Sequence, residues 1–544
     1  MSRQVRVWPF GLIAIAVGGY AGVVGLRHTV PGWAAQPSHG FTADHPGLHG
    51  LLLAALLVAL GWGLLRARMI ALVAMVLLVG WVTVAVDHSA WSALPLAYAL
   101  ALVLCHHGFT AVPDRGQIRA AVRNGAVALA VTVLIGWAAR HDWVPYLGLA
   151  ASGFIVILVV LVSAMHSAAA PAPGSAGERT RVACLVRAQG ADTLAPFLLR
   201  SDKSYLFSAD GNAVLGYRVL FGVAVVGGDP VGDPAAYPEL LARFVALCRR
   251  NGWRPAVLGA RTELAGLWRE QGMSGVNYGE EVMLDVEHFS LATRRMRNVR
   301  QAVGRTYNAG VSTRVVPAAE LSPELLAEMA RLSARWLGKA RERGFSMMLD
   351  GLFDNARHPD TIFVLAFDAA GSVVGFQRYL PAGLGYGPRP VPGAALSLDV
   401  MRRERGRLNG LNERMIVEIV DYAKDRGIGL VSLNFAAFRG LLDRGGDRTP
   451  VQQLGYRTLH LLDPFIQVES LYLFNAKFRP GYLARRVAFS SWFALPAVLL
   501  ALLGLEFALP YDLRRSHGTL ALPEPVDTER SRLPGWRRHV TSRH

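Results

Sequence analysis

Cysteine is scarce in this chain, which has three cysteines in 544 residues. Cys105, Cys184 and Cys248 are scattered, with no Cys-x-x-Cys pair and no histidine at a metal-ligand spacing. We therefore expect buried small side chains and predict neither a disulfide nor a zinc site. The Ser-His-Asp, His-Glu-x-x-His and P-loop patterns are also missing. No sequence signature of a serine hydrolase, a zincin or a P-loop NTPase is present.

Long apolar stretches, in contrast, fill the first 166 residues. Each has about 15 to 21 mostly apolar residues, against the roughly 20 that a helix needs to cross a bilayer. No ionisable residue lies deep in them, which favours an anchor over a pump or channel. The first stretch is long and is followed by others, so we do not expect a cleaved signal peptide. The six stretches are 8–26, 46–65, 69–86, 91–107, 125–139 and 146–166.

The loops between these stretches alternate in charge. Arginines cluster before the first stretch, between the second and third, and between the fourth and fifth, whereas the other loops carry few. The positive-inside rule then predicts six crossings, a cytoplasmic N-terminus and a cytoplasmic remainder from residue 167. We expect a multi-pass inner-membrane protein whose large domain faces the cytoplasm. The arginines are Arg3, Arg6, Arg66, Arg68, Arg115, Arg119 and Arg123.

The rest of the chain predicts an α/β domain behind a linker. Residues 167–179 are rich in Ala, Pro, Gly and Ser, which is typical of a linker. From 180 to 487, strand patterns alternate with amphipathic helical ones, and a hairpin is expected around Phe221 and Gly222. Residues 488–509 are apolar enough to suggest another crossing. A crossing there would place the basic tail 510–544 on the side away from the cytoplasm, against the positive-inside rule. We expect an interfacial or docked helix.

The net charge of +17 suits partners that carry negative charge. Anionic lipid surfaces and nucleic acid both fit this balance, and composition does not choose between them.

The segment SLDVMRRERGRLNGLNERM, residues 397–415, is the strongest local candidate for a site. A strand ends near Asp399, an arginine-rich loop follows, and a helix opens near Leu411. Free N–H groups and the helix dipole make such a helix start favourable for phosphate. The run from Arg407 through Asn409 to Asn412 resembles the pyrophosphate loop of N-acetyltransferase-like (GNAT) folds. Arg407 and Asn409 are therefore candidate substrate-binding residues, with a solvated arginine loop as the alternative.

Asp399 and Arg402 are the candidate catalytic residues of this segment. A carboxylate at a strand end between Leu398 and Val400 is expected to be partly buried beside Arg402. Asp399 could then orient a hydroxyl or hold a substrate amine, and Arg402 could steady an oxyanion or a phosphate. The pattern equally allows a structural Asp–Arg pair.

Residues 291–307 predict a helix with an arginine stripe. At 100° per residue, three arginines share one side and apolar residues share the other. A solvated face is one interpretation, and contact with a phosphate backbone or lipid headgroups is the other. The arginines are Arg294, Arg297 and Arg305, with Arg300 beside them. The apolar residues are Met296, Val299 and Val303.

Five motifs in order resemble the lysylphosphatidylglycerol synthase (multiple peptide resistance factor) family, most closely the versions fused to a lysyl-tRNA synthetase. They cover about 200–487. The motifs are GDPVG at 228–232, SLDVMRR at 397–403, NGLNE at 409–413, SLNFAAFR at 432–439 and FNAKFRP at 474–480.

The resemblance implies a pair of GNAT-like halves, 180–330 and 331–487, with the active site in the second. It implies aminoacyl transfer, with lysine expected, from aminoacyl-tRNA to phosphatidylglycerol, which lowers membrane negative charge. By the same resemblance Asp399 and Arg402 are catalytic, and Asn434 and Lys477 bind substrate. The ester donor is already activated, so no cofactor or metal is expected.

Two other functions fit the same residues. One is a different lipid-directed acyltransferase, with an acyl-CoA donor or another acceptor. The other is a non-catalytic lipid-binding or flippase protein.

Overall fold

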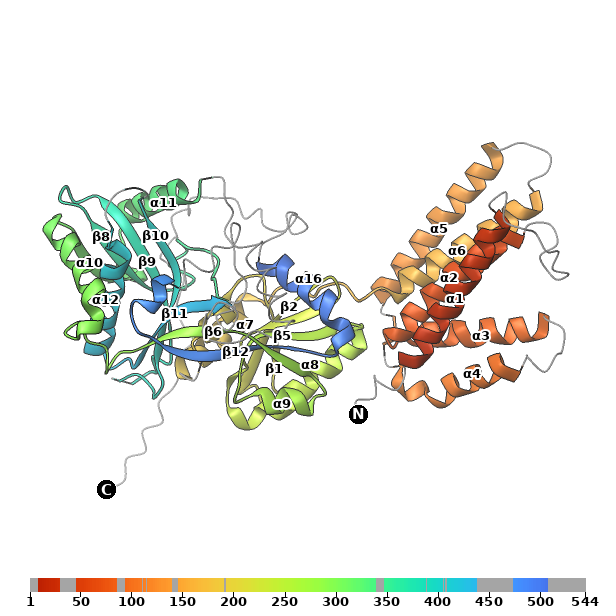
Figure 1. The fold of residues 1–544 in the computed structure, drawn as a ribbon, viewed down its shortest axis with the longest axis horizontal. Helices are drawn as coiled ribbons and strands as arrows, with labels where there is room; N and C mark the ends of the chain where they lie inside the picture. Colours follow the sequence, from red (N-terminus) through yellow and green to blue (C-terminus); the bar gives the residue numbers. More distant parts are fainter. Residues whose placement is uncertain are drawn as a thin grey trace, which may run out of the picture.

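The structure is a computed structural model of the whole chain. It divides into a helical bundle at one end and a large mixed sheet with covering helices at the other (Figure 1). The residues that it describes are 8–29, 46–85, 93–109, 111–113, 115–138, 145–189, 192–338, 347–387, 389–404, 406, 409–437 and 473–506. The basic tail 510–544 lies outside these ranges.

Six helices form the bundle, and their apolar residues pack around Leu60, Leu64, Met75, Leu102 and Met165. Arg115, Arg119 and Arg123, expected in a loop, instead form the first turns of the fifth helix. Within the ranges that the structure describes, none of the helices combines the length and hydropathy that a bilayer crossing requires. That these six segments cross a membrane is therefore still a prediction from the sequence. The helices are α1 (Trp8–Thr29), α2 (Pro46–Leu65), α3 (Met69–Ala85), α4 (Ala93–Leu104), α5 (Arg115–Ala138) and α6 (Pro145–Met165).

The predicted linker is partly helical. Residues 167–174 connect the bundle to the sheet, and α7 (Ala176–Ala188) then begins inside the range expected to be irregular. Ser175 caps this helix: its hydroxyl accepts from the backbone N–H of Glu178, whose carboxylate accepts from the N–H of Ser175. This capping box supplies partners for otherwise unsatisfied N–H groups and explains the early start.

One 12-stranded sheet runs through the rest of the chain, which confirms the predicted α/β character. Its order is β1-β2-β3-β5-β12-β6-β11-β10-β9-β8-β7, with β4 beside β2. The first strands are β1 (Ser204–Phe207), β2 (Ala213–Leu220), β3 (Val223–Gly227), β4 (Val231–Gly232), β5 (Arg254–Arg261) and β6 (Ser274–Asp285). The others are β7 (Ser312–Pro317), β8 (Ile362–Phe367), β9 (Val373–Ala382), β10 (Ala395–Arg403), β11 (Leu430–Ala437) and β12 (Gly481–Phe489).

The same strand pattern occurs twice. In the first half, antiparallel strands lead to β3, which pairs in parallel with β5 across the helix α8 (Tyr237–Asn251). In the second half, antiparallel strands lead to β10, which pairs in parallel with β11 across α12 (Leu411–Asp425). The halves also interlock, because β6 pairs with β11 of the second half while β12 returns to pair with β5.

Helices cover both faces of the sheet. Over the second half, α10 (Arg297–Asn308) and α12 share one core, and α11 (Pro323–Leu337) packs on the opposite face. The predicted boundary between the halves at position 330 falls inside these cores, because residues on both sides of it belong to them. Over the first half, α8 and α9 (Ala265–Glu270) lie on one face. On the other face, α16 (Leu495–Glu506) packs Val498 and Ala501 against β3 and β5.

Candidate active site

The parallel strands β10 and β11 part at the position of the predicted site. Their pairing ends at Ser397 and Ser432, whereas β10 stays paired with β9 as far as Arg403. A β-bulge interrupts β10 between Leu398 and Val400, so Asp399 is the extra residue. Bulges of this kind release backbone groups from the ladder and are frequent beside active sites.

The neighbouring strand is irregular at the same level. The register between β11 and β6 shifts between Ser432 and Phe435, and Asn434 lies in that interval. The side chain of Asn434 is outside the described part of the structure. The backbone positions of Asp399 and Asn434 therefore lie on two adjacent strands that separate at this point.

The side chain of Asp399 is fully buried, and Arg378 of β9 contacts its carboxylate. The carboxylate accepts a hydrogen bond from Arg378 of β9 and another, at 3.0 Å, from the backbone N–H of Leu349. Arg378 also donates to the carbonyls of Leu349 at 2.5 Å and Gly351 at 3.2 Å. The sequence pattern had suggested Arg402 as the neighbour, whereas these hydrogen bonds come from β9 and from the loop at 349–351. The arrangement matches the open alternative of a structural Asp–Arg pair.

Arg402 faces α11 instead. Its guanidinium lies 4.0 Å from the centre of the Trp336 ring, and the residue is 7% exposed. A cation over an indole face is stabilised by the ring quadrupole. The structure therefore holds Asp399 and Arg402 through different neighbours, although both belong to β10.

His358 was missed by the sequence analysis and lies close to this charge cluster. Among the described residues neither ring nitrogen has a hydrogen-bond partner, and the residue is 7% exposed. Burial, and then the positive charge of Arg378, lower the pKa of His358 to about 4. The imidazole is therefore neutral at neutral pH. Nothing in the sequence singles out His358, because it precedes a proline and belongs to no recognisable motif.

The start of α12 carries the predicted phosphate loop. Gly410 takes φ +113° as the N-cap, and Asn409 beside it is exposed. Arg407 lies outside the described residues. Lys477, predicted to bind substrate, has its ammonium 3.0 Å from the Glu413 carboxylate in the first turn of α12, and its side chain is 43% exposed.

The predicted arginine helix packs directly against this loop. A Cβ on Gly410 would lie 2.4 Å from the carbonyl oxygen of Ala302 in α10, so only glycine allows this approach. The structure confirms the amphipathic pattern of the helix. The three arginines of the stripe are all exposed: Arg294, Arg297 and Arg305. The apolar residues of the opposite side are all buried: Met296, Val299 and Val303. The exposed arginines and the start of α12 therefore form one region of the second half.

A second cluster of charges is buried where the halves interlock. Arg485 of β12 reaches Glu281 at 2.5 Å and Asp192 at 2.6 Å. Asp229 of the GDPVG motif accepts from Arg261 at 2.9 Å. Burial, and then the charge of Asp192, raise the pKa of Asp229 to about 6. The GDPVG motif thus places a carboxylate where the two halves interlock.

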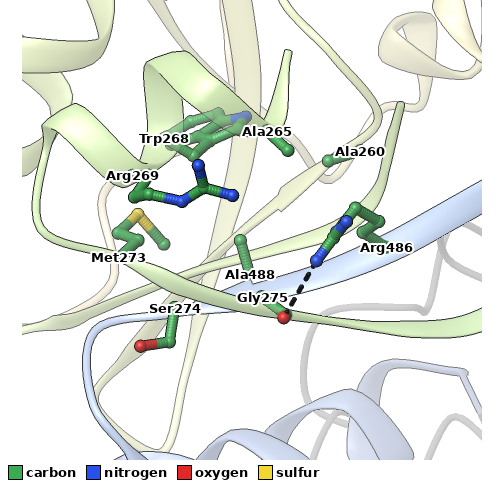
Figure 2. Close-up of a pocket in the computed structure, with 9 residues that line it drawn as sticks. All are labelled: Ala260, Ala265, Trp268, Arg269, Met273, Ser274, Gly275, Arg486 and Ala488. Atoms are coloured by element: carbon green, nitrogen blue, oxygen red, sulfur yellow. Dashed lines mark hydrogen bonds between the residues drawn. The ribbon is translucent and has the colours of Figure 1, made fainter. Parts of the chain in front are cut away.

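A cavity of about 290 Å³ opens in the first half between α9, β6 and β12. Figure 2 shows Arg269 and Arg486 on two sides of it, with Arg486 donating to the carbonyl of Gly275 at 3.1 Å. Trp268 and Met273 contribute apolar surface. None of the residues predicted from the sequence lines this cavity.

Comparison with known proteins identifies relatives of this chain. An MprF-like domain protein of Mycobacterium tuberculosis is 41% identical over 333 residues, covering 60% of this chain and 66% of that protein. The lysylphosphatidylglycerol biosynthesis bifunctional protein LysX of Gordonia bronchialis is 37% identical over 358 residues, covering 64% of this chain and 31% of that protein. The chain thus spans about two thirds of the first relative and less than a third of the second.

Two solved structures share the fold. The C-terminal domain described as that of a lysylphosphatidylglycerol synthetase from Agrobacterium fabrum matches with a TM-score of 0.52 at 22% identity, covering 61% of this chain and 98% of that one. L-PGS from Bacillus licheniformis matches with a TM-score of 0.52 at 21% identity, covering 60% of this chain and 96% of that one. The family described as phosphatidylglycerol lysyltransferase, C-terminal, matches residues 183–489. The chain belongs to this aminoacyltransferase family.

Proposed function

We propose that this protein transfers an aminoacyl group, with lysine as the first candidate, from aminoacyl-tRNA to phosphatidylglycerol at the cytoplasmic face of the inner membrane. Family membership supports aminoacyl transfer to this lipid in general. One observation supports placing the reaction in the second half: β10 and β11 separate beyond Ser397 and Ser432, in the same half as the exposed arginines of α10.

The reaction needs positioning more than strong chemical activation. A glycerol hydroxyl of the lipid attacks the carbonyl carbon of the aminoacyl ester, a new ester bond forms, and the bond to the terminal ribose oxygen breaks. The proton of the glycerol hydroxyl ends on the ribose hydroxyl that leaves. One ester replaces another, so holding the two substrates together supplies a large share of the acceleration.

The second half offers the groups that such a reaction requires. Beyond Ser397, β10 no longer pairs with β11, and we place the reacting ester at the point where these two strands separate. The buried pair of Asp399 and Arg378 fixes this strand against the loop at 349–351. In this account Asp399 is a positioning residue, and Arg402 lies over Trp336 where it can meet a phosphate.

The arginines of α10 supply the contact with the tRNA backbone. Arg297 and Arg305 of α10 are exposed, as is Arg294 in the 3₁₀ turn that precedes the helix, and α10 packs next to the start of α12. Such a stripe binds phosphates irrespective of base sequence. A donor delivered there brings its acyl end toward the separated strands.

The bundle is proposed to hold the domain at the bilayer. Its helices expose large apolar side chains, including Tyr20 at 74%, Leu77 at 67% and Leu104 at 71%. Apolar surface of this extent is unusual in a soluble monomer and is expected where a protein contacts lipid. The alternation of arginines between the predicted spans supports a cytoplasmic position for the sheet-containing part.

Mass spectrometry of lipids from cells with and without the protein tests the proposal. We expect a phosphatidylglycerol species that is heavier by one amino-acid residue only when the protein is present. Arg402→Gln is expected to lose this species, whereas Arg403→Gln, the adjacent matched change, is expected to keep it. A wild-type protein that is expressed and folded but adds no such mass would refute the proposal.

A further inference from the structure

A basic cavity lies at the junction between the helical bundle and the sheet. It has a volume of about 120 Å³ and lies between the turn that links α2 to α3 and the turn that links α8 to β5. Arg66 enters it from the bundle, and Arg249 and Arg254 enter it from the sheet side. The hydroxyl-bearing residues Ser490 and Ser491 complete its polar wall. It shares no residue with the candidate active site.

The cavity concentrates positive charge in a half-buried position. Burial, and then the charges of Arg254 and Arg68, lower the pKa of Arg66 to about 9. Burial also lowers the pKa of Arg254. No carboxylate in the described part of the chain offsets these effects on Arg66. Guanidinium groups gathered in this way are stabilised by an anion that bonds to several of them at once.

Direct hydrogen bonds fix the walls of this cavity. The backbone N–H of Ala168 donates to the carbonyl of Asn251 at 3.0 Å, and the indole N–H of Trp253 donates to the carbonyl of Ala168 at 2.8 Å. Arg68 donates to the carbonyl of His166 at 2.5 Å. The segment that leaves the bundle is therefore tied to the α8–β5 turn, which holds the two sides of the cavity together.

Apolar and aromatic side chains border the arginines. Trp8 of α1 and Phe493 pack edge to face at 4.3 Å between ring centres, and both line the cavity. Phe493 is 73% exposed and Leu12 is 50% exposed. The neighbouring helix α16 also exposes Leu499, Leu500 and Leu503. Cations next to exposed aromatic and apolar groups are typical of a membrane interface.

We propose that this junction cavity binds the phosphate of an anionic membrane phospholipid, with its acyl chains along the exposed sides of α1 and α16. This inference rests on the membrane placement in the proposed function. The bound lipid is distinct from the acceptor lipid, because the cavity and the active site use different residues. Its phosphate bridges the bundle and the sheet, and so fixes the orientation of the catalytic domain relative to the bilayer.

Phosphatidic acid is a suitable probe, because it carries a phosphate but lacks the free glycerol hydroxyl that an acceptor needs. The full chain is placed in phosphatidylcholine nanodiscs that contain phosphatidic acid, released, and examined by native mass spectrometry for retained lipid. We expect wild type to retain phosphatidic acid. Arg249→Gln and Arg254→Gln are each expected to weaken retention about tenfold, the usual effect of losing one charged hydrogen bond.

Arg250→Gln is the matched control, because Arg250 is the exposed neighbour of Arg249 on α8 and does not line the cavity. It is expected to retain the lipid like wild type. Equal losses in Arg249→Gln and Arg250→Gln would overturn the proposal, as would full retention in both cavity variants. Inorganic phosphate is added in a parallel sample. Displacement of the lipid by phosphate alone at equal concentration would contradict the lipid assignment.

A measurement on wild type does not depend on the variants being folded. A photoactivatable phosphatidic acid is expected to crosslink to peptides that contain residues 249–255 or 490–494. Crosslinks confined to other regions would overturn the proposal. Neither measurement involves aminoacyl transfer, so a failure here is distinct from a failure of the proposed catalytic activity.

Discussion

Arg378 of β9 donates to the carboxylate of Asp399 at the bulge of β10, and both side chains are shielded from solvent. Because Arg378 also donates to the carbonyls of Leu349 and Gly351, the pair ties two strands and one loop together. The residue first considered for catalysis therefore has a clear structural task. The two roles predict different outcomes for the same substitution.

Asp399→Asn is expected to lower the free energy of unfolding by about 3–5 kcal/mol, because the buried charge of Arg378 then lacks its partner. Arg378→Met should cost a similar amount. The double variant Arg378→Met with Asp399→Leu should lose much less than the sum of the single changes. Chemical denaturation of the full chain measures all three. Strictly additive losses, or no loss in Asp399→Asn, would contradict the structural role.

His358 is expected to make stability depend on pH. Its pKa is about 4 in the folded chain and 6.5 in the unfolded one, so the unfolded state binds an extra proton between these values. Folding stability should therefore fall as the pH is lowered from 6.5 toward 4. Thermal unfolding of wild type and His358→Gln across this range measures the effect, and the variant should lose this dependence.

His288 provides a control of opposite sign. Its exposed ring bonds to Asp285, which raises the pKa of His288. Any contribution from this residue is present at low pH and is lost as the pH rises through its raised pKa. His288→Gln should leave the loss of stability below pH 6.5 in place. A pH profile for His358→Gln that matches wild type would show that His358 does not titrate as described.

Gly410 allows α10 to approach the start of α12. Gly410→Ala places a methyl group against the carbonyl of Ala302 at a φ of +113°, and should cost about 2 kcal/mol or more. Gly304→Ala in α10 is the matched control, because no atom lies within 4 Å of its new Cβ. That change should be neutral, or stabilising by up to about 1 kcal/mol. Equal effects of both changes on the unfolding midpoint would contradict this packing.

The arginine stripe formed by α10 and the 3₁₀ turn before it should determine RNA affinity. Changing Arg294, Arg297 and Arg305 to Gln is expected to weaken tRNA binding and to reduce the slope of log affinity against log salt by about 2 to 3. Arg250, Arg331 and Arg335 are exposed elsewhere and form a matched triple of equal charge. Binding titrations at several salt concentrations measure both variants. If the two triples lose the same affinity, the stripe has no special role.

Features set by local periodicity were predictable from the sequence. The buried and exposed sides of α10 follow from a 3.6-residue repeat, and the hairpin of β2 and β3 turns at Phe221 and Gly222, both with positive φ. The predicted helix start near Leu411 also agrees, because Gly410 marks it. Each of these features depends on residues that are close together in the sequence.

Features set by long-range pairing were not predictable. The partner of Asp399 is Arg378 on another strand, and a one-residue bulge decides which neighbour the carboxylate meets. Arg485 meets Glu281 only because β12 and β6 lie together although 204 residues separate the pair. Registers and bulges of this kind depend on the whole sheet, and no spacing in the sequence records them.

The central claim is that the chain moves an aminoacyl group from RNA to lipid. The most direct test incubates the purified full chain with phosphatidylglycerol vesicles and tRNA carrying radiolabelled lysine, and then counts label in extracted lipid. We expect labelled lipid that disappears when phosphatidylglycerol is omitted or when the tRNA is first digested with ribonuclease. If neither lysyl-tRNA nor a total pool of labelled aminoacyl-tRNA transfers label to lipid, while the protein is folded and binds RNA, the claim is contradicted.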